Sequence, residues 1–486
     1  MAPSLFTTAV LSVLAASSLA QATKKTEFDF IVVGGGTAGL AVASRLSQYL
    51  PNNTVLVIEA GPDGRNVPGI YIPGMKGSTL GGIYDYNFTT VAQPHAGGRS
   101  WAQNRGKVLG GSSALNLMCW DRASVAEYDA WEHIGNPGWN WDNMITSMLK
   151  VENYTQSVYP GQEIDQGVGV DGPIHATINR IQPADQDTWI PTMEKLGFPE
   201  NMESLGGNPL GVSIQPNNID TTKYTRSYSP EYLKIAGDNL YVMTDAQVVK
   251  VNTEKRAGRV VATGVTLKNN VTINACKEVI LSAGSFQSPG LLELSGIGNS
   301  SIITAAGIEP VLELPTVGEN LQDHACAVLG LDLKPGTITM DILGDPQVME
   351  AAGKALVETQ SGPLTSIVST QGFLPYKLQA PASELESTVK SIRETQQLSS
   401  TTPFYKRQLD QVIANLESDK SANLQFIVVP AGADYENGIA TQKIWPPPDN
   451  NSLHRMVIAS CLQYPVARGT CHITSSGELI ADAPTV

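Results

Sequence analysis

Cysteine is scarce in this chain, which has only five among its 486 residues. A disulfide-dense scaffold requires many more, and the absence of any C-x-x-C pair argues against a zinc site. Cys461 and Cys471 could face each other across neighbouring strands, although simple buried thiols are an equally good interpretation. The remaining three are Cys119, Cys276 and Cys326.

Charged residues are also few, at 16% of the chain, and they are unbalanced, with 46 acidic against 32 basic side chains. The net charge of −14 argues against nucleic acids and anionic membranes as partners. Hydrophobic residues make up 42% of the chain, which excludes a disordered protein and supplies material for buried cores. The length indicates two or more domains.

No segment after residue 20 has the length and apolarity of a membrane span. Residues 1–20 are apolar and uncharged, and Ser18-Leu19-Ala20 fits a small-x-small cleavage site that leaves Gln21 as the mature start. We interpret this segment as a secretory signal peptide; because it also lacks Lys and Arg, a short anchor is the alternative. Six N-x-S/T triplets agree with a secreted glycoprotein, and N-glycans are expected at Asn52, Asn87, Asn153, Asn270, Asn299 and Asn450.

The first informative pattern in the sequence is a βαβ unit. Residues 28–33 form a continuous apolar run, which is typical of a buried parallel strand. A glycine turn and a predicted helix over residues 38–50 follow, and residues 54–59 predict a second strand.

The turn carries the pattern Gly34-x-Gly36-x-x-Gly39. Gly34 permits the bend, Gly36 lets a pyrophosphate approach the backbone, and Gly39 allows the helix to pack closely on the strand. The phosphate would meet the N-terminus of the helix, and Glu59 at the end of the second strand could bind ribose hydroxyls. The unit therefore predicts dinucleotide binding, without separating FAD from NAD.

The rest of the chain divides by composition. Residues 62–104, rich in Gly, Pro and aromatic residues, predict long loops, whereas residues 239–252 and 271–285 predict strands. Beyond residue 331 the pattern changes to helix-prone segments over 383–416 and apolar strands such as 424–429, which indicates a second domain.

Three further motifs follow the βαβ unit. GKVLGGSSALNLMCW, at residues 106–120, contains a Gly/Ser loop rich in donors, and Asn116 in it could donate to or accept from the edge of a heterocycle. Alone, this stretch would be an ordinary Gly/Ser loop. GSFQSPGLLELSGIG (284–298) and VGENLQDH (317–324) accompany it.

Together these motifs resemble the glucose-methanol-choline (GMC) oxidoreductase family of FAD enzymes. The Gly-Gly-Ser-Ser stretch is similar to one family signature and the 284–298 stretch to the other, while TRSYSPEYL (225–233) and Asn239-Leu240 resemble further blocks. The resemblance covers residues 28–476, nearly all of the mature chain, and secreted fungal alcohol oxidases and dehydrogenases are the most similar group.

The resemblance implies a fold class and a set of cofactor contacts. The fold is α/β: a Rossmann-like FAD-binding domain, built from separated segments, with an α+β substrate domain that has an antiparallel sheet. Gly34, Gly36, Thr37 and Ala38 would hold the diphosphate, and Glu59 the adenosine ribose. Ser112, Asn116, Leu117 and Cys119 would lie along the flavin and its ribityl chain, and the backbone of Val248 would meet the adenine.

The same resemblance implies the domain boundaries. Residues 28–150 and 236–330 would form two parts of the FAD-binding domain, and residues 151–235 and 331–486 two parts of the substrate domain. A final segment of the FAD-binding domain is expected to be absent.

The family's catalytic base is a histidine in that C-terminal segment, near a His-Pro…Gly-Thr-Cys pattern. A second His or Asn follows it, and together they take the hydroxyl proton of the substrate while hydride leaves the carbinol carbon for flavin N5, a task suited to a neutral imidazole. All six histidines of this chain precede that place. We interpret His472, beside Gly469-Thr470-Cys471, as a strand residue and His324 as a loop residue, and we assign no catalytic residue. Because that segment would complete the FAD-binding domain, the chain is also expected to retain FAD poorly or to fold poorly.

Three hypotheses remain at this point. The first is an FAD-dependent oxidoreductase that acts on a CH–OH group of a small alcohol or of a secondary-metabolite intermediate. The second is a relative that keeps FAD but runs non-redox chemistry as a lyase or cyclase. The third is a secreted remnant without turnover.

Overall fold

The structure is a computed structural model. It describes residues 25–158, 161–180, 186–366, 369–398, 401–433, 454–475 and 478–482. The predicted signal peptide at residues 1–20 and the triplet at Asn450 lie outside these ranges.

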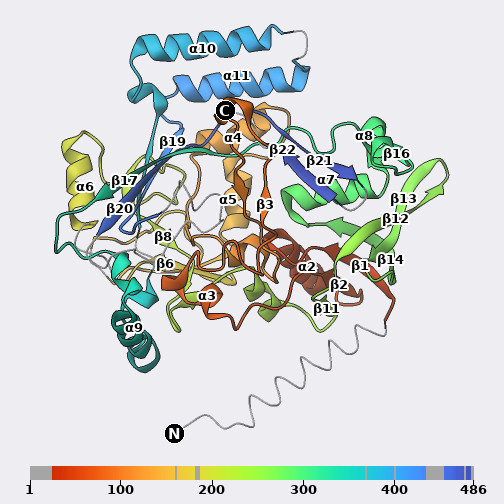
Figure 1. The fold of residues 1–486 in the computed structure, drawn as a ribbon, viewed down its shortest axis with the longest axis horizontal. Coiled ribbons are helices and arrows are strands. Elements are labelled where there is room, and N and C mark those ends of the chain that lie inside the picture. Colours follow the sequence, from red (N-terminus) through yellow and green to blue (C-terminus); the bar gives the residue numbers. More distant parts are fainter. Residues whose placement is uncertain are drawn as a thin grey trace.

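A six-stranded sheet forms one half of the molecule and contains the predicted βαβ unit (Figure 1). Four of its strands run parallel, and the last two join antiparallel as a hairpin at one edge. The spatial order is β11 (Leu240–Met243), β2 (Val55–Ile58), β1 (Glu27–Val33), β14 (Thr272–Leu281), β13 (Arg259–Leu267) and β12 (Val248–Arg256).

Both faces of the central strands are buried, as their continuous apolar sequences predict. On β1, Phe30 and Val32 pack with Leu40 of α2 (Thr37–Tyr49) on one face, whereas Ile31 and Val33 belong to the core on the other face. The predicted strand, turn, helix and second strand of the βαβ unit are therefore confirmed.

A five-stranded antiparallel sheet forms the other half, built from segments far apart in the sequence. Its order is β17 (Ala325–Asp332), β20 (Arg455–Leu462), β19 (Leu424–Val429), β18 (Thr370–Leu374) and β7 (Gly211–Ile214). The predicted antiparallel sheet is thus present, and the predicted boundary between residues 330 and 331 falls inside β17.

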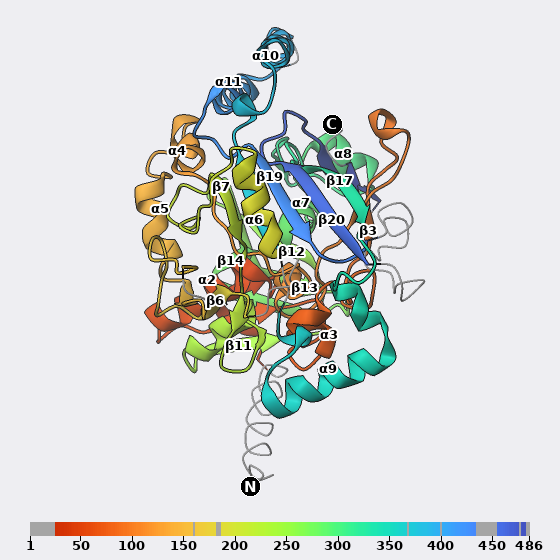
Figure 2. The same ribbon diagram turned by 90° about the vertical axis from the view of Figure 1, so that its left-hand side faces the viewer.

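The helices surround the two sheets, and α10 and α11 stand together at one end of the molecule in both views (Figure 2). Among the residues that the structure describes, none of the helices combines the length and apolar composition that a bilayer crossing requires. Besides α2, the α-helices of the described residues are α3 (Pro68–Tyr71), α4 (Val125–His133), α5 (Trp141–Met148), α6 (Gln186–Lys195), α7 (Gly284–Leu294), α8 (Ser300–Ala305), α9 (Pro346–Thr359), α10 (Ala382–Gln396) and α11 (Pro403–Glu417).

Small sheets of two or three strands complete the described part of the fold. The region at residues 62–104, predicted as loops, contains only short elements. The small sheets are β5 (Glu152–Thr155) with β6 (Ile174–Ile178) and β8 (Pro216–Asn217), β9 (Ile219–Asp220) with β10 (Thr225–Arg226), β3 (Phe88–Thr89) with β4 (Ala102–Gln103), β15 (Ile297–Gly298) with β16 (Leu312–Glu313), and β21 (Thr470–Ser475) with β22 (Glu478–Asp482).

The possible pairing of Cys461 with Cys471 is wrong. Cys461 forms a disulfide with Cys326, which lies directly opposite it on β17. Cys471 lies in β21, part of a different sheet, where it is a buried free thiol packed against Phe286. The neighbours of β20 are β17 and β19, so only Cys326 is within reach.

The single strand predicted over residues 239–252 is also corrected. The chain leaves β11 after Met243 and turns at Asp245, whose φ of 54° is incompatible with a continuous strand. The Asp245 N–H donates to the carbonyl of Gly61, which ties the turn to the loop after β2. The second half of the segment then starts β12 at the far edge of the sheet.

Candidate functional site

The loops that follow β1, β2 and β14 meet at the carboxyl edge of the parallel strands. The Gly34 N–H donates to the Ile58 carbonyl over 2.8 Å, and the Ser282 N–H donates to the Val33 carbonyl over 2.8 Å. In open α/β sheets this edge is where ligands bind.

Gly34 and Gly39 bring α2 close to β1. Gly34 has a φ of 100°, in the left-handed region that favours glycine. A Cβ at Gly39 would lie 1.9 Å from the Gly34 carbonyl oxygen, so no side chain fits there. These two residues therefore occupy the positions that close packing of helix on strand requires.

Two glycine backbones face each other beside the N-terminus of α2; we call this the glycine crevice. A Cβ at Gly111 would lie 2.8 Å from the Cα of Gly36, and the Gly110 N–H donates to the Gly35 carbonyl over 2.8 Å. Within the described residues, α2 has no side-chain cap and no acidic residue in its first turn, and Thr37 and Ala38 are exposed. The free N–H groups of the first turn and the helix dipole suit this crevice to an anion.

Glu59 closes the crevice on the side of β2 and is 5% exposed. Its two carboxylate oxygens accept hydrogen bonds from the N–H groups of Gly35 (2.9 Å) and Gly61 (2.8 Å). Burial nevertheless raises the pKa of Glu59 to about 7. Each oxygen has a second lone pair, so the carboxylate can accept further hydroxyl donors.

The Gly/Ser motif continues from the crevice toward the five-stranded sheet. Ser112 and Asn116 are exposed, whereas Leu117 and Cys119 are half-buried. Asn116 Oδ1 accepts hydrogen bonds from Arg226 Nη1 (2.6 Å) and from the Met118 N–H (3.2 Å), while its Nδ2 makes none within the described residues. The amide is thus held by its oxygen and presents its donors to the accessible side.

Val248 is the first residue of β12, and the segment before it lies beside Glu59. The Ala246 N–H donates to the Glu59 carbonyl over 2.9 Å. Val248 itself is half-buried and pairs with Leu267. The structure therefore brings Val248 to the β2 side of the carboxyl edge, although β12 is the farthest strand of the sheet from β11.

A group of polar side chains lies beyond Cys119, and sequence reasoning missed it. The members of this amide cluster are Asp121, Gln215, Gln371 and Gln425, which come from separate segments. Gln425 Nε2 donates to Asp121 Oδ2 over 2.8 Å, and Gln215 Nε2 donates to Gln371 Oε1 over 3.0 Å.

Three ionisable groups lie in or beside the amide cluster: Asp121 belongs to it, and Lys76 and Cys119 are its neighbours. Burial raises the pKa of Asp121, although this side chain keeps an accessible surface, a combination typical of a residue that lines an internal space. Burial likewise lowers the pKa of Lys76 to about 8 and raises that of the Cys119 thiol to about 11, so the thiol stays protonated at neutral pH. The only signal in the sequence was the position of Asp121 just after the Gly/Ser motif.

The two histidines singled out in the sequence lie outside the glycine crevice. His472 is in β21, as predicted, with Nδ1 2.7 Å from Glu293 Oε1 and Nε2 3.2 Å from Glu319 Oε1. The Glu293 carboxylate also accepts the Ile473 N–H, so this pair joins α7 to β21. His324 lies in the loop before β17, where its backbone N–H donates to Asp323.

Comparison with known proteins gives consistent matches. A family model described as GMC oxidoreductase matches residues 28–326. The chain is 33% identical over 485 residues to dehydrogenase mpl7 of Monascus purpureus, a match that covers 95% of this chain and 77% of that protein.

Solved structures share the fold. An FAD-dependent oxidoreductase from Chaetomium thermophilum superposes with a TM-score of 0.79 at 24% identity, over 94% of this chain and 78% of that one. A fungal aryl-alcohol oxidase gives a TM-score of 0.77 at 24% identity, over 94% of this chain and 79% of the other.

Proposed function

The chain belongs to the GMC oxidoreductase family and takes FAD as its cofactor, and from this premise we propose that it oxidises a CH–OH group. The substrate would be a small alcohol or a secondary-metabolite intermediate. The names of the dehydrogenase and aryl-alcohol oxidase relatives support this choice of reaction. The electron acceptor that FAD provides is the hydride-accepting N5 of its flavin ring.

The observation that carries the proposal is the glycine crevice at the start of α2. We assign the diphosphate to the exposed start of the helix, where Gly36, Thr37 and Ala38 offer N–H groups, and Gly34, whose own N–H donates to Ile58, provides the bend that leads to them. The close approach of Gly36 and Gly111 matters because only hydrogen occupies the inner wall there. Gly39 acts indirectly, by holding the helix against β1.

Other residues would hold the two ends of the cofactor. Glu59 has unused lone pairs for the adenosine ribose, and Val248 lies beside it for a backbone contact with the adenine. Along the flavin end, Asn116 presents its amide donors and Ser112 its exposed hydroxyl, with Leu117 and Cys119 beyond.

The amide cluster continues from the flavin end and supplies a hydrogen-bonding wall for the substrate. Asp121 is the member of this cluster that keeps an accessible surface, so it is the one that a substrate can reach. Gln425 donates to its Oδ2, which holds the carboxyl in place, and Gln215 and Gln371 are bonded to each other behind it. Asp121 would thus orient the alcohol by a hydrogen bond to its hydroxyl.

The test is reduction of the flavin by alcohols without oxygen. The protein is saturated with added FAD and mixed anaerobically with a panel of primary, aryl and secondary alcohols. We expect one class to bleach the visible flavin band. A panel that leaves the band intact while the FAD stays bound would contradict the proposal and favour the non-redox lyase or cyclase. No FAD binding and no turnover would favour the remnant.

We also propose that the protein is a secreted glycoprotein. Asn52, Asn87 and Asn270 are exposed and accessible to glycosylation, whereas Asn153 and Asn299 are half-buried. A structural disulfide between Cys326 and Cys461 agrees with an oxidising compartment. Deglycosylation of protein from its native host would lower its mass if glycans are attached, and an unchanged mass would contradict the assignment.

A further inference from the structure

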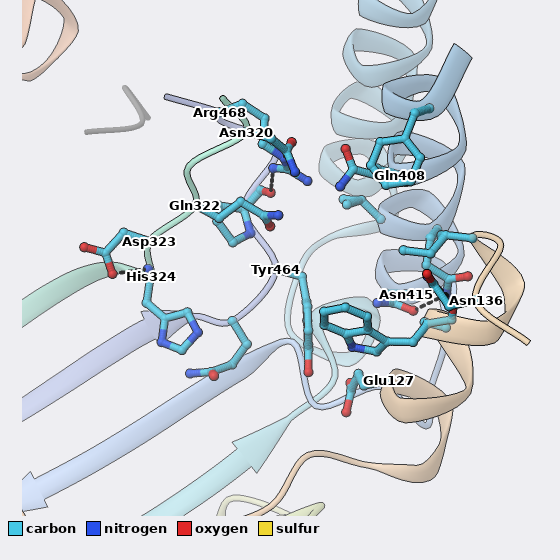
Figure 3. Close-up of a pocket in the computed structure, with 18 residues that line it drawn as sticks. Glu127, Asn136, Asn320, Gln322, Asp323, His324, Gln408, Asn415, Tyr464 and Arg468 are labelled. Atoms are coloured by element: carbon cyan, nitrogen blue, oxygen red, sulfur yellow. Dashed lines mark hydrogen bonds between the residues drawn. The ribbon is translucent and has the colours of Figure 1, made fainter. Parts of the chain in front are cut away.

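A second pocket lies between α4, α11 and two loops at residues 320–324 and 463–468, and none of the proposed cofactor contacts lines it. We call it the α4–α11 pocket. Its volume of about 480 Å³ falls within the range of small-molecule sites. Figure 3 shows Gln408 on α11 across from Asn320 and Arg468, and Asn415 farther along the same helix beside Asn136.

The lining of this pocket is rich in carboxamides. Seven of its eighteen residues are Asn or Gln, and each such side chain can both donate and accept hydrogen bonds. Gln408 is 9% exposed, and its Oε1 has no hydrogen-bond partner within the described residues. A buried acceptor left without a partner is costly, so this oxygen favours a donor from a ligand.

The carboxylates and the guanidinium in the lining already have hydrogen-bond partners, and Asp323 accepts from the Gln103 amide and from the His324 backbone N–H. The Glu127 carboxylate accepts hydrogen bonds from Ser124, Ser421 and Ala422. Arg468 donates from Nη1 to three backbone carbonyls and from Nε to Asn320 Oδ1. The pocket therefore offers mainly neutral hydrogen-bonding groups to a ligand.

Aromatic surface completes the pocket. Trp131 on α4 and Phe404 on α11 both line it, and they remain 55% and 43% exposed. Large aromatic faces that stay solvent-accessible beside polar groups mark a binding surface, since burying them would stabilise the fold.

We propose that the α4–α11 pocket binds a saccharide ring, distinct from the alcohol oxidised at the flavin. Sugar hydroxyls both donate and accept, which matches the carboxamides, and the C–H faces of the ring match Trp131 and Phe404. The carboxylates and the guanidinium of the lining are already engaged, which favours a neutral ligand over a charged one. Such a ring could be a free sugar or the end of a polysaccharide chain, and both present the same chemistry.

The test is calorimetric titration of the full chain with glucose, cellobiose and maltose, at fixed FAD. We expect saturable binding by at least one of them, and binding of glucuronate that is no tighter than that of glucose. Gln408→Leu and, separately, Trp131→Ala should each weaken binding about tenfold. Gln347→Leu and Tyr49→Ala, exposed positions outside the pocket, should leave the affinity unchanged.

Sedimentation with insoluble cellulose separates the two sources. Protein that pellets, and that Trp131→Ala releases, would identify a polysaccharide end; binding of soluble sugars alone would identify a free sugar. The proposal is overturned if no saccharide binds to the folded protein, or if binding survives both pocket substitutions. Thermal unfolding of each variant verifies its fold, and because no turnover is measured, the result is independent of the proposed oxidation.

Discussion

At the scale of single residues, Glu59 provides a test of the adenosine end of the cofactor site. Burial raises its pKa to about 7, so the carboxyl is partly protonated near neutrality. Ribose hydroxyls donate better to the ionised form, and binding must therefore release the proton at lower pH. We predict that FAD affinity falls below pH 7, by up to about tenfold per pH unit.

Fluorescence titrations with FAD between pH 6 and 8, in steps, measure this dependence around the pKa of about 7. Glu59→Gln keeps the side-chain shape but cannot ionise, so it should bind FAD more weakly and without the pH dependence. A wild-type affinity that does not change with pH would show that the ionised carboxylate makes no contact with the ribose.

His472 should make stability depend on pH through its contact with Glu293. The adjacent Glu293 carboxylate raises the pKa of His472 above its ordinary value of 6.5. Because the folded-state pKa is the higher one, the contribution to stability is complete below pH 6.5 and is lost as pH rises through the folded value. Chemical unfolding at several pH values should show this loss in the wild type.

His472→Gln preserves a hydrogen bond to Glu293 without a titrating group. The variant should be less stable than the wild type below pH 6.5, where the wild type has the full contribution, and this difference should shrink as pH rises through the folded pKa of His472. If both proteins lose stability equally, another group titrates.

The residues of the proposed cofactor site differ in how far their position could be predicted from local sequence. The positions of Gly34, Gly39 and Glu59 in the fold could be predicted because one βαβ unit contains all three within a short stretch of chain. Asp121 and Gln425 could not be paired from the sequence, because their hydrogen bond joins residues 304 positions apart. Nothing in the sequence around Gln425 distinguishes it from any polar residue of a strand.

At the scale of elements, the contact of α2 with β1 decides whether the crevice forms. Gly39→Ala would place a Cβ 1.9 Å from a backbone oxygen, and we expect it to lower the free energy of unfolding by about 1–3 kcal/mol. Gly353→Ala in α9 is the matched control, since nothing lies within 4 Å of its added Cβ.

In that control the gain in helix propensity should stabilise the protein by about 0.5–1 kcal/mol. Urea unfolding of both variants gives the two values. Changes of the same sign and size would contradict a special packing role for Gly39.

Element prediction succeeded where the pattern was long and regular. The helix-prone segment at residues 383–416 is confirmed as α10 and α11, and residues 424–429 as β19. It failed over residues 239–252, because strand-forming residues on both sides of Thr244-Asp245 extend the strand pattern across the turn at Asp245. That turn depends on Gly61, a residue nearly two hundred positions earlier, which no local pattern reports.

At the scale of the whole molecule, the disulfide fastens the edge of the five-stranded sheet. Cys326 and Cys461 are 135 residues apart, so the bond closes a long loop in the unfolded chain. Replacing both by Ser should lower the free energy of unfolding by about 2–5 kcal/mol. Cys276→Ser, at an exposed free thiol, should change stability little, and an equal loss in both proteins would contradict the assignment.

The arrangement of the two halves follows from pairing between distant segments. Composition placed the boundary between the two domains near residue 331. That position lies inside β17, whose place in the five-stranded sheet is determined by its pairing with the distant strand β20. The partner of Cys461 was missed for the same reason. The order of the motifs along the sequence was enough to predict the fold class, through the resemblance to the family. The order of the strands within each sheet could be read only from the three-dimensional structure.

The central claim is that FAD binds with its diphosphate in the glycine crevice. The most direct measurement is an FAD titration of the wild type and of Gly36→Leu, with Gly353→Ala as control. Gly36 has an ordinary φ of −85°, and an added Cβ would lie 3.7 Å from Gly111, so the variant should fold while its side chain fills the crevice. We predict saturable one-to-one binding that Gly36→Leu weakens by at least about tenfold and Gly353→Ala does not. Equal affinity in a folded Gly36→Leu protein would contradict the account.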